Sequence, residues 1–187
     1  MCSKKKVVIV TYGFHPPEVF AEEVGRRIKK SGLEDVIVLK FKPSCIPNNI
    51  HDLPTLEVWK LNEIGIAEQG NFLRQEFKKI DFHIDLHDTP LERYGKDLLY
   101  YLSFPGCNVK LRSWLENFSE IQKAKGRNIR VEAVPLYKGS FYHSTNIDFA
   151  LYYPSLDNEE LEQKLDESFK FTLEFIGYLR ANYLCRN

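Results

Sequence analysis

The chain has 187 residues, and Lys plus Arg and Asp plus Glu each total 26, so the formal net charge at pH 7 is zero. That balance argues against a general nucleic-acid binder, which normally carries a basic excess. A chain of this length can bury a sizeable core within one domain. We therefore expect residues 1–187 to form a single domain with no nucleic-acid partner.

The apolar runs have the length of strands, so we expect no membrane-spanning helix and no membrane partner. The first run, Val7–Val10, is too short for the hydrophobic segment of a secretory signal, which favours a cytoplasmic protein. The cysteines show no CxxC spacing and are predicted to be free thiols rather than zinc ligands. They are Cys2, Cys45, Cys107 and Cys185.

The first forty residues show a strand–helix–strand pattern. The β-branched run Lys6–Tyr12 ends at Gly13 and predicts a buried strand. Asp35–Phe41 predicts a second strand, and a helix between the two implies that they are parallel. The helix is indicated by Phe20, Val24 and Ile28, spaced four apart, and by its end at Ser31-Gly32.

The rest of the chain alternates helices and strands without a repeat. This order predicts a three-layer α/β fold, with helices on both faces of a mostly parallel, mixed sheet. The predicted elements are a loop over Pro43–Pro54, a helix over Thr55–Lys79 with a break near Gly70, strands over Ile80–Leu86 and Asp97–Phe104, a helix over Asn108–Lys125, strands over Ile129–Leu136 and Ile147–Tyr153, and a final helix N-capped by Asp157.

Two histidines and a glutamate follow the ends of predicted strands. In open α/β sheets, ligands bind outside the carboxyl ends of the strands. His15 and Glu18 are three residues apart after the first strand, and His87 ends the third. Two histidines and one carboxylate form a catalytic type of zinc set with one position left for water. We predict one zinc ion held by His15, Glu18 and His87, with Asp85 as a hydrogen-bond partner behind them.

Two further histidines have less specific positions. His83 lies two residues before Asp85, and either shares its face of the strand or packs inside the sheet. His51 falls in the predicted loop, and we expect it to be solvated rather than to bind a ligand.

These motifs resemble those of the zinc carboxypeptidase superfamily, in particular its succinylglutamate desuccinylase/aspartoacylase branch. The matching segments are Gly13-x-His15-x-x-Glu18 after a strand, and Ile84-Asp85-Leu86-His87. The resemblance implies a zinc-dependent amide hydrolase, of the metallocarboxypeptidase or N-acyl amino acid deacylase type. Its substrate would be a small acylated amino acid or a short peptide. N-formylglutamate amidohydrolases, which also use an Asp-x-His segment near zinc, remain an alternative.

The chain departs from this family where substrate carboxylate is bound. The family's Asn-Arg pair has no counterpart between Pro43 and Leu61, a stretch without arginine. Arg74, Arg93 and Arg112 are candidates to replace the pair through a bidentate contact, or they are plain surface residues.

The general base is the second departure, because two registers compete for it. Glu132, in Arg130-Val-Glu132-Ala-Val-Pro135, resembles the family's Val-Glu-x-Gly-Pro segment and would be the base. In the other register the last strand is the counterpart, and it has no glutamate. Tyr142 and His143 precede that strand and either steady an oxyanion or belong to a surface loop.

Three functions therefore stay open. The favoured one is a zinc-dependent amide hydrolase with Glu132 as base. The second is a metal-binding relative that has lost its base. The third is an α/β domain without metal that binds a small ligand or a partner. The sequence predicts neither the substrate nor the oligomeric state.

Overall fold

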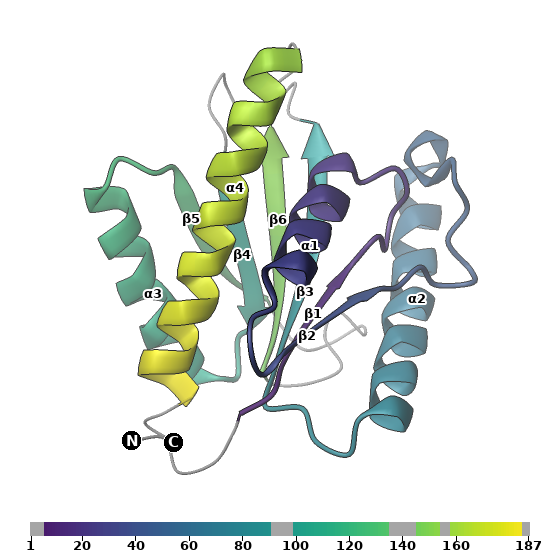
Figure 1. Ribbon diagram of the computed structural model, residues 1–187. Helices are drawn as coiled ribbons and strands as arrows, with labels where there is room; N and C mark the ends of the chain where they lie inside the picture. The colour runs from purple at the N-terminus through teal and green to yellow at the C-terminus, as the bar shows by residue number, and fades with distance from the viewer. Residues whose placement is uncertain (1–5, 91–98, 135–144, 154–157, 185–187) are drawn as a thin grey trace.

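The computed structural model describes residues 6–90, 99–134, 145–153 and 158–184. Figure 1 shows a twisted sheet with helices on both of its sides. The prediction of a three-layer α/β fold with a mostly parallel, mixed sheet is confirmed. The elements are β1 (Val8–Tyr12), α1 (Val19–Ser31), β2 (Val36–Lys40), the 3-10 helix η1 (Ile50–Asp52), α2 (Thr55–Glu76), β3 (Phe82–Pro90), β4 (Leu99–Pro105), α3 (Val109–Ala124), β5 (Ile129–Val134), β6 (Asn146–Tyr153), α4 (Asn158–Tyr178) and the π-helical η3 (Leu179–Leu184).

The six strands lie in the order β2-β1-β3-β6-β4-β5. Neighbours are parallel except at the β4–β6 pair, which is antiparallel. The carboxyl ends of β1, β3 and β6 therefore lie at one edge of the sheet, and β4 and β5 run the opposite way.

One face of the sheet is apolar and carries three helices. Alternation along each strand turns Val10, Ile84 and Phe149 to this face, and all three are fully buried. The helices α1, α3 and α4 cover it (Figure 1). Rings interlock between the helices, since the Phe118 centroid lies 5.2 Å from that of Phe175. This cluster is the main core, so burial of apolar area here stabilises the whole domain.

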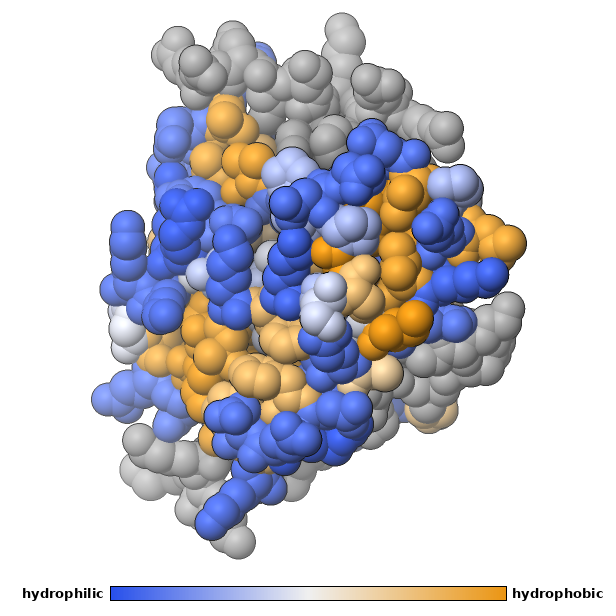
Figure 2. All heavy atoms as spheres, turned by 90° about the vertical axis from the view of Figure 1, so that its right-hand side faces the viewer, coloured by the Kyte–Doolittle hydropathy of each residue, from blue (hydrophilic) through white to orange (hydrophobic). Residues whose placement is uncertain are grey.

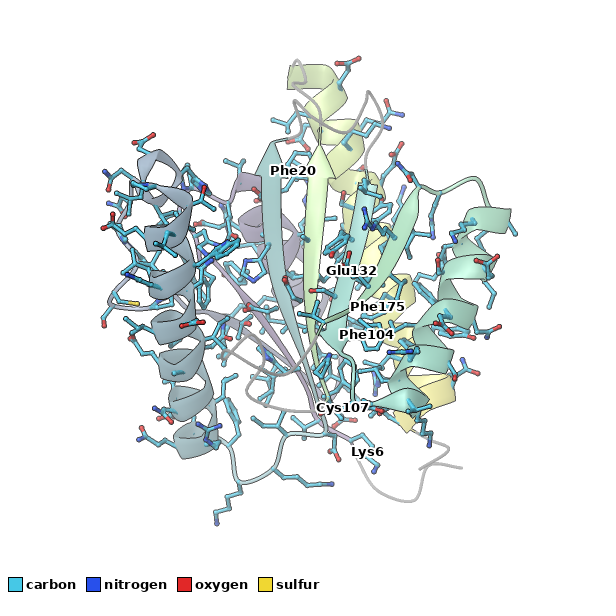
Figure 3. The ribbon with its side chains drawn as sticks, turned by 180° about the vertical axis from the view of Figure 1, so that it is seen from behind. Lys6, Phe20, Phe104, Cys107, Glu132 and Phe175 are labelled. Carbon is cyan, nitrogen blue, oxygen red and sulfur yellow. The ribbon has the colours of Figure 1, made fainter. Side chains whose placement is uncertain are left out.

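The opposite face carries polar side chains and is covered by α2. Thr11 of β1 and Asp85 of β3 face this side, and Gln69 of α2 donates hydrogen bonds to both. Figure 3, seen from behind, shows α2 on this side of the sheet. Figure 2 shows the side on which α2 lies, where hydrophilic side chains surround smaller hydrophobic areas. This helix leaves Trp59 more than half exposed.

Two predicted boundaries are wrong, and one lies outside the described residues. The helix α2 is continuous through Gly70, because a glycine inside a helix costs only about 1 kcal/mol and this one is buried. The strand β3 continues past Leu86 to Pro90, since it pairs with β6 along that length, so His87 lies within the strand. The predicted cap Asp157 is outside the described residues. None of the described helices has both the length and the apolar character needed to cross a bilayer.

Candidate metal centre

The turn between β1 and α1 brings His15 and Glu18 to the carboxyl edge of the sheet. Gly13 has a φ of +85°, a conformation open to glycine, and the chain bends there as it leaves β1. Glu18 is the N-cap residue of α1, yet its side chain does not cap the helix. Instead its Oε2 accepts a hydrogen bond of 3.1 Å from the backbone N–H of His15. Glu18 is only 1% exposed, so its carboxylate is held inside the site.

The adjacent strand β3 supplies His87 to the same place. Its Nδ1 lies 2.9 Å from Oε1 of Glu18, and that oxygen lies 3.5 Å from Nδ1 of His15. One ligand atom from each residue lies within 4.8 Å of the other two. In a tetrahedral zinc site with bonds of about 2.1 Å, ligand atoms are about 3.4 Å apart. The donor set and its spacing therefore fit one zinc ion with few adjustments.

His15 and His87 both turn Nδ1 toward Oε1 of Glu18. Nε2 of His87 lies 3.2 Å from Oδ2 of Asp85. Nε2 of His15 lies 2.7 Å from Oδ1 of Asn62 in α2. Because both acceptors bind an N–H, they fix the proton on Nε2 and leave Nδ1 of each ring free to bind a metal.

The charges of the site are strongly coupled. Burial alone would lower the pKa of His87, but the carboxylates of Asp85, Asp148 and Glu18 outweigh it and raise that pKa well above its ordinary value. Burial opposes the charge on Glu18, yet His87 and His15 lower its pKa. Asp85 also has a lowered pKa despite burial, because His87 and Thr11 favour its charged form. The site thus holds buried negative charge, which a divalent cation would neutralise.

Two residues around these candidate ligands, Asn62 and Asp148, were not predicted from the sequence. Asn62 carries no sequence signal beyond its place in a helix. Asp148 pairs with Asp85 across β3 and β6, and its Oδ1 lies 3.5 Å from Nε2 of His87. Burial raises the pKa of Asp148, and the charge of Asp85 adds to that effect. The signal for Asp148 was available, since it lies on the predicted last strand.

Asp88 was missed as well, and it serves α1 rather than the metal. Its Oδ2 accepts a hydrogen bond of 2.7 Å from the backbone N–H of Ala21, in the first turn of α1. It therefore caps the helix in place of Glu18, whose side chain is turned to the site. Burial raises the pKa of Asp88 to about 7, and the charge of Glu18 adds to the rise while the Ala21 N–H opposes it.

The remaining histidines differ from each other in position. His83 is fully buried, and its Nε2 lies 2.7 Å from Oγ1 of Thr11, so it belongs to the polar side of the sheet. His51 is exposed on η1, but its ring centroid lies 6.4 Å from that of His15. The loop that carries His51 is anchored by a small core in which Phe14, Ile46 and Ile50 are buried. His51 therefore borders the metal centre instead of lying apart from it.

Glu132 does not lie with the three metal-binding candidates. It is on β5, three strands from β3 in the sheet, and strands about 4.8 Å apart give a separation of about 14 Å. Its Oε2 accepts hydrogen bonds from the hydroxyl of Tyr101 at 2.7 Å and from Arg130 at 3.1 Å. Figure 3 labels Glu132 on the β4–β5 side of the sheet. Its role as the general base stays a prediction.

The substrate-binding candidates are scattered. Arg74 lies in the last turn of α2, where it donates to Asn71, and Arg112 is exposed on α3. Arg93, Tyr142 and His143 lie outside the described residues.

Solved structures of known proteins share this fold. The crystal structure of murine aminoacylase 3 has a TM-score of 0.52 and 15% sequence identity, covering 94% of this chain and 65% of that chain. Over the aligned part, the chain is similar in fold to aminoacylase 3. A point mutant of the same murine protein gives a TM-score of 0.53, again at 15% identity, with 95% of this chain and 65% of that chain covered. The chain thus spans slightly less than two thirds of aminoacylase 3.

The crystal structure of an N-acetylmuramoyl-L-alanine amidase from Clostridium difficile 630 has a TM-score of 0.49 and 11% identity, covering 96% of this chain and all of that one. No protein-family model and no curated protein matches the sequence.

Proposed function

We propose that this chain is a zinc-dependent amide hydrolase that acts on a small acylated amino acid or a short peptide. The observation that carries the proposal is the meeting of His15, Glu18 and His87, with Oε1 of Glu18 within 2.9 and 3.5 Å of the two Nδ1 atoms. Two sources support it. The likeness in fold is to a protein named aminoacylase, and the two sequence motifs resemble the aspartoacylase-like branch of the zinc carboxypeptidase superfamily.

When bound, zinc would act as a Lewis acid that polarises the scissile carbonyl and activates water. The chain's own residues would hold it through two neutral imidazoles and one buried carboxylate. Asp85 and Asn62 keep both imidazoles turned by accepting their Nε2–H groups. His51, exposed beside His15, would donate an N–H to the substrate's carbonyl or carboxylate oxygen.

The proton that leaves the attacking water needs a carboxylate to accept it and pass it to the departing amine. Glu132 is the residue predicted from the sequence, and it would have to reach the site from β5. Asp148 is nearer, because it lies on β6 beside β3 and its Oδ1 has no hydrogen-bond partner among the described residues. We therefore propose to test both.

The experiment measures zinc content and hydrolysis together. Purified protein should contain about one zinc per chain by elemental analysis and should release amine from a panel of N-acylated amino acids and dipeptides. The variants Glu132→Gln and Asp148→Asn should keep the zinc, and the one that removes the base should lower kcat by at least about a hundredfold. Glu120→Gln, on the exposed surface of α3, is the matched control and should behave as the wild type.

A second candidate function is a metal-binding relative without activity. The observation that favours it is the engagement of Glu132 by Tyr101 and Arg130, three strands from the metal-binding residues. Protein that is replete with zinc but inert toward the whole panel would support this second function. Protein without zinc after preparation in zinc-supplemented buffer would refute both functions and leave a metal-free α/β domain.

A further inference from the structure

A single helix stands behind both histidines of the metal centre. Oδ1 of Asn62 lies 2.7 Å from Nε2 of His15. Gln69 donates from Nε2 to Oδ2 of Asp85 at 3.1 Å, and the same oxygen lies 3.2 Å from Nε2 of His87. Asn62 and Gln69 are both on α2, seven residues or about two turns apart, so they project from the same side of the helix.

The two amides act with opposite hydrogen-bond polarity. Asn62 accepts through its oxygen, which requires His15 to carry its proton on Nε2. Gln69 donates through its nitrogen to Asp85, whose carboxylate can only accept. Thr11 donates to the other oxygen of Asp85 at 2.5 Å. With both oxygens oriented by these donors, Asp85 is fixed as the acceptor for His87.

The helix is packed tightly against the site, so these side chains have little freedom to move. A Cβ added at Gly65, between the two amides in α2, would lie 2.8 Å from Cζ of Phe14 and 3.0 Å from Cγ of Pro43. The ring centroid of Phe14 lies 4.7 Å from that of His15 and 5.6 Å from that of His87. Phe14 therefore connects the close approach of α2 to both imidazole rings.

We infer that Asn62 and Gln69 are positioning residues that set the metal affinity of the site, although α2 supplies no metal ligand. This inference rests on the proposed zinc site and adds the element that orients it. Partners behind metal-binding histidines typically change metal affinity by ten- to a hundredfold when they are removed. Each amide acts on a different histidine, so the losses from the two should multiply.

The test replaces each amide with the isosteric acid and measures the zinc Kd. We expect little change at position 62 and a clear rise at position 69. Asn62→Asp keeps an acceptor for His15, so zinc affinity should stay within about threefold of the wild type. Gln69→Glu replaces a donor with an acceptor beside Asp85, so the zinc Kd should rise by more than tenfold. Asn62→Leu and Gln69→Met each remove the hydrogen bond and should raise the Kd about tenfold, or about a hundredfold together.

Asn71→Leu is the control, because Asn71 lies on the same helix and its Oδ1 accepts a hydrogen bond from the exposed Arg74. Its zinc Kd, measured by competition with a chromophoric chelator, should stay within twofold of the wild type. Should Gln69→Glu fail to fold, Gln69→Met decides the matter. Equal affinities for Asn62→Leu, Gln69→Met and Asn71→Leu would overturn the inference, as would equal effects of the two isosteric changes.

A second readout separates this inference from the proposed function. Imidazole ¹⁵N shifts in the metal-free protein, recorded at a pH high enough for both rings to be neutral, report which nitrogen carries the proton. Asn62→Leu should change the shifts of His15 alone, and Gln69→Met those of His87 alone. If the wild type bound no zinc, the proposed function and the role in metal affinity would both be refuted, while these shifts would still decide whether α2 orients the histidines.

Discussion

The close contact between α1 and β1, at Gly25 and Tyr12, predicts how much a larger side chain would lower the unfolding free energy. A Cβ added at Gly25 would lie 2.4, 2.7 and 2.9 Å from Cδ1, Cγ and Cε1 of Tyr12. Ordinary contact begins at about 3.4 Å, so the ring or the helix must move by about 1 Å. Tyr12 is 5% exposed, and its ring cannot swing into solvent.

The expected cost of Gly25→Ala combines two effects. Overpacking a buried contact costs about 1–3 kcal/mol, and the upper end applies because the clash is with the ring near its attachment. Alanine recovers about 1 kcal/mol of helix propensity, so the net loss in unfolding free energy is about 2 kcal/mol. Gly177→Ala is the matched control, because a Cβ there meets nothing within 4 Å and the variant should gain up to about 1 kcal/mol.

Urea denaturation of the wild type and both variants measures this difference directly. The two variants should differ by about 3 kcal/mol, or roughly 6–12 °C in Tm for a chain of this size. Gly25→Ala as stable as the wild type would refute the close approach of α1 to β1 on which the position of Glu18 depends.

Three further predictions concern charge, metal and substrate. Burial opposes the charge on Glu174, but Lys125, Arg127 and Gln122 lower its pKa from 4.5 to about 2. The contribution of the charged Glu174 to the unfolding free energy is therefore complete above pH 4.5 and is lost as the pH falls toward 2. Urea titrations at pH 6 and pH 3 should show this loss in the wild type and a smaller one in Glu174→Gln. Zinc at a hundredfold its Kd should raise the unfolding free energy of the wild type by about 2.7 kcal/mol. The resulting rise in Tm should disappear when a chelator is added and should be absent in His15→Ala. His51→Ala should lower kcat/KM about tenfold, the effect of about 1.4 kcal/mol, with zinc content unchanged; an unaltered rate would exclude contact between His51 and substrate.

Much of the fold was predictable because it depends on local patterns. The β-branched runs at β1 and β2 and the four-residue spacing of Phe20, Val24 and Ile28 determine element type through side-chain geometry alone. The predicted break at Gly70 was wrong because burial of that residue outweighs the modest helix penalty of glycine. Strand β3 was predicted too short, since its pairing with β6 adds residues that lack a strand-like sequence.

The proximity of the three candidate metal ligands was predictable for a topological reason. His15 and Glu18 follow β1, and His87 lies in the carboxyl-terminal half of the parallel strand β3; the carboxyl ends of parallel neighbours meet at one edge of the sheet. The roles of Asn62 and Gln69 were not predictable, because both are ordinary helical amides until α2 is placed against the histidines. The position of Glu132 likewise depends on strand order, which places β5 at the far edge of the sheet.

The sequence by itself therefore determined the types of element, the α/β class and the three side chains that are candidates to bind one ion. Those features follow from periodicity and from the direction of consecutive strands, which are local properties of the chain. Only the tertiary structure decided which nitrogen of each histidine faces Glu18, which carboxylates surround these three side chains and which helix lies behind the histidines. These depend on hydrogen bonds between residues 16, 47 and 69 positions apart, whose geometry no local pattern records.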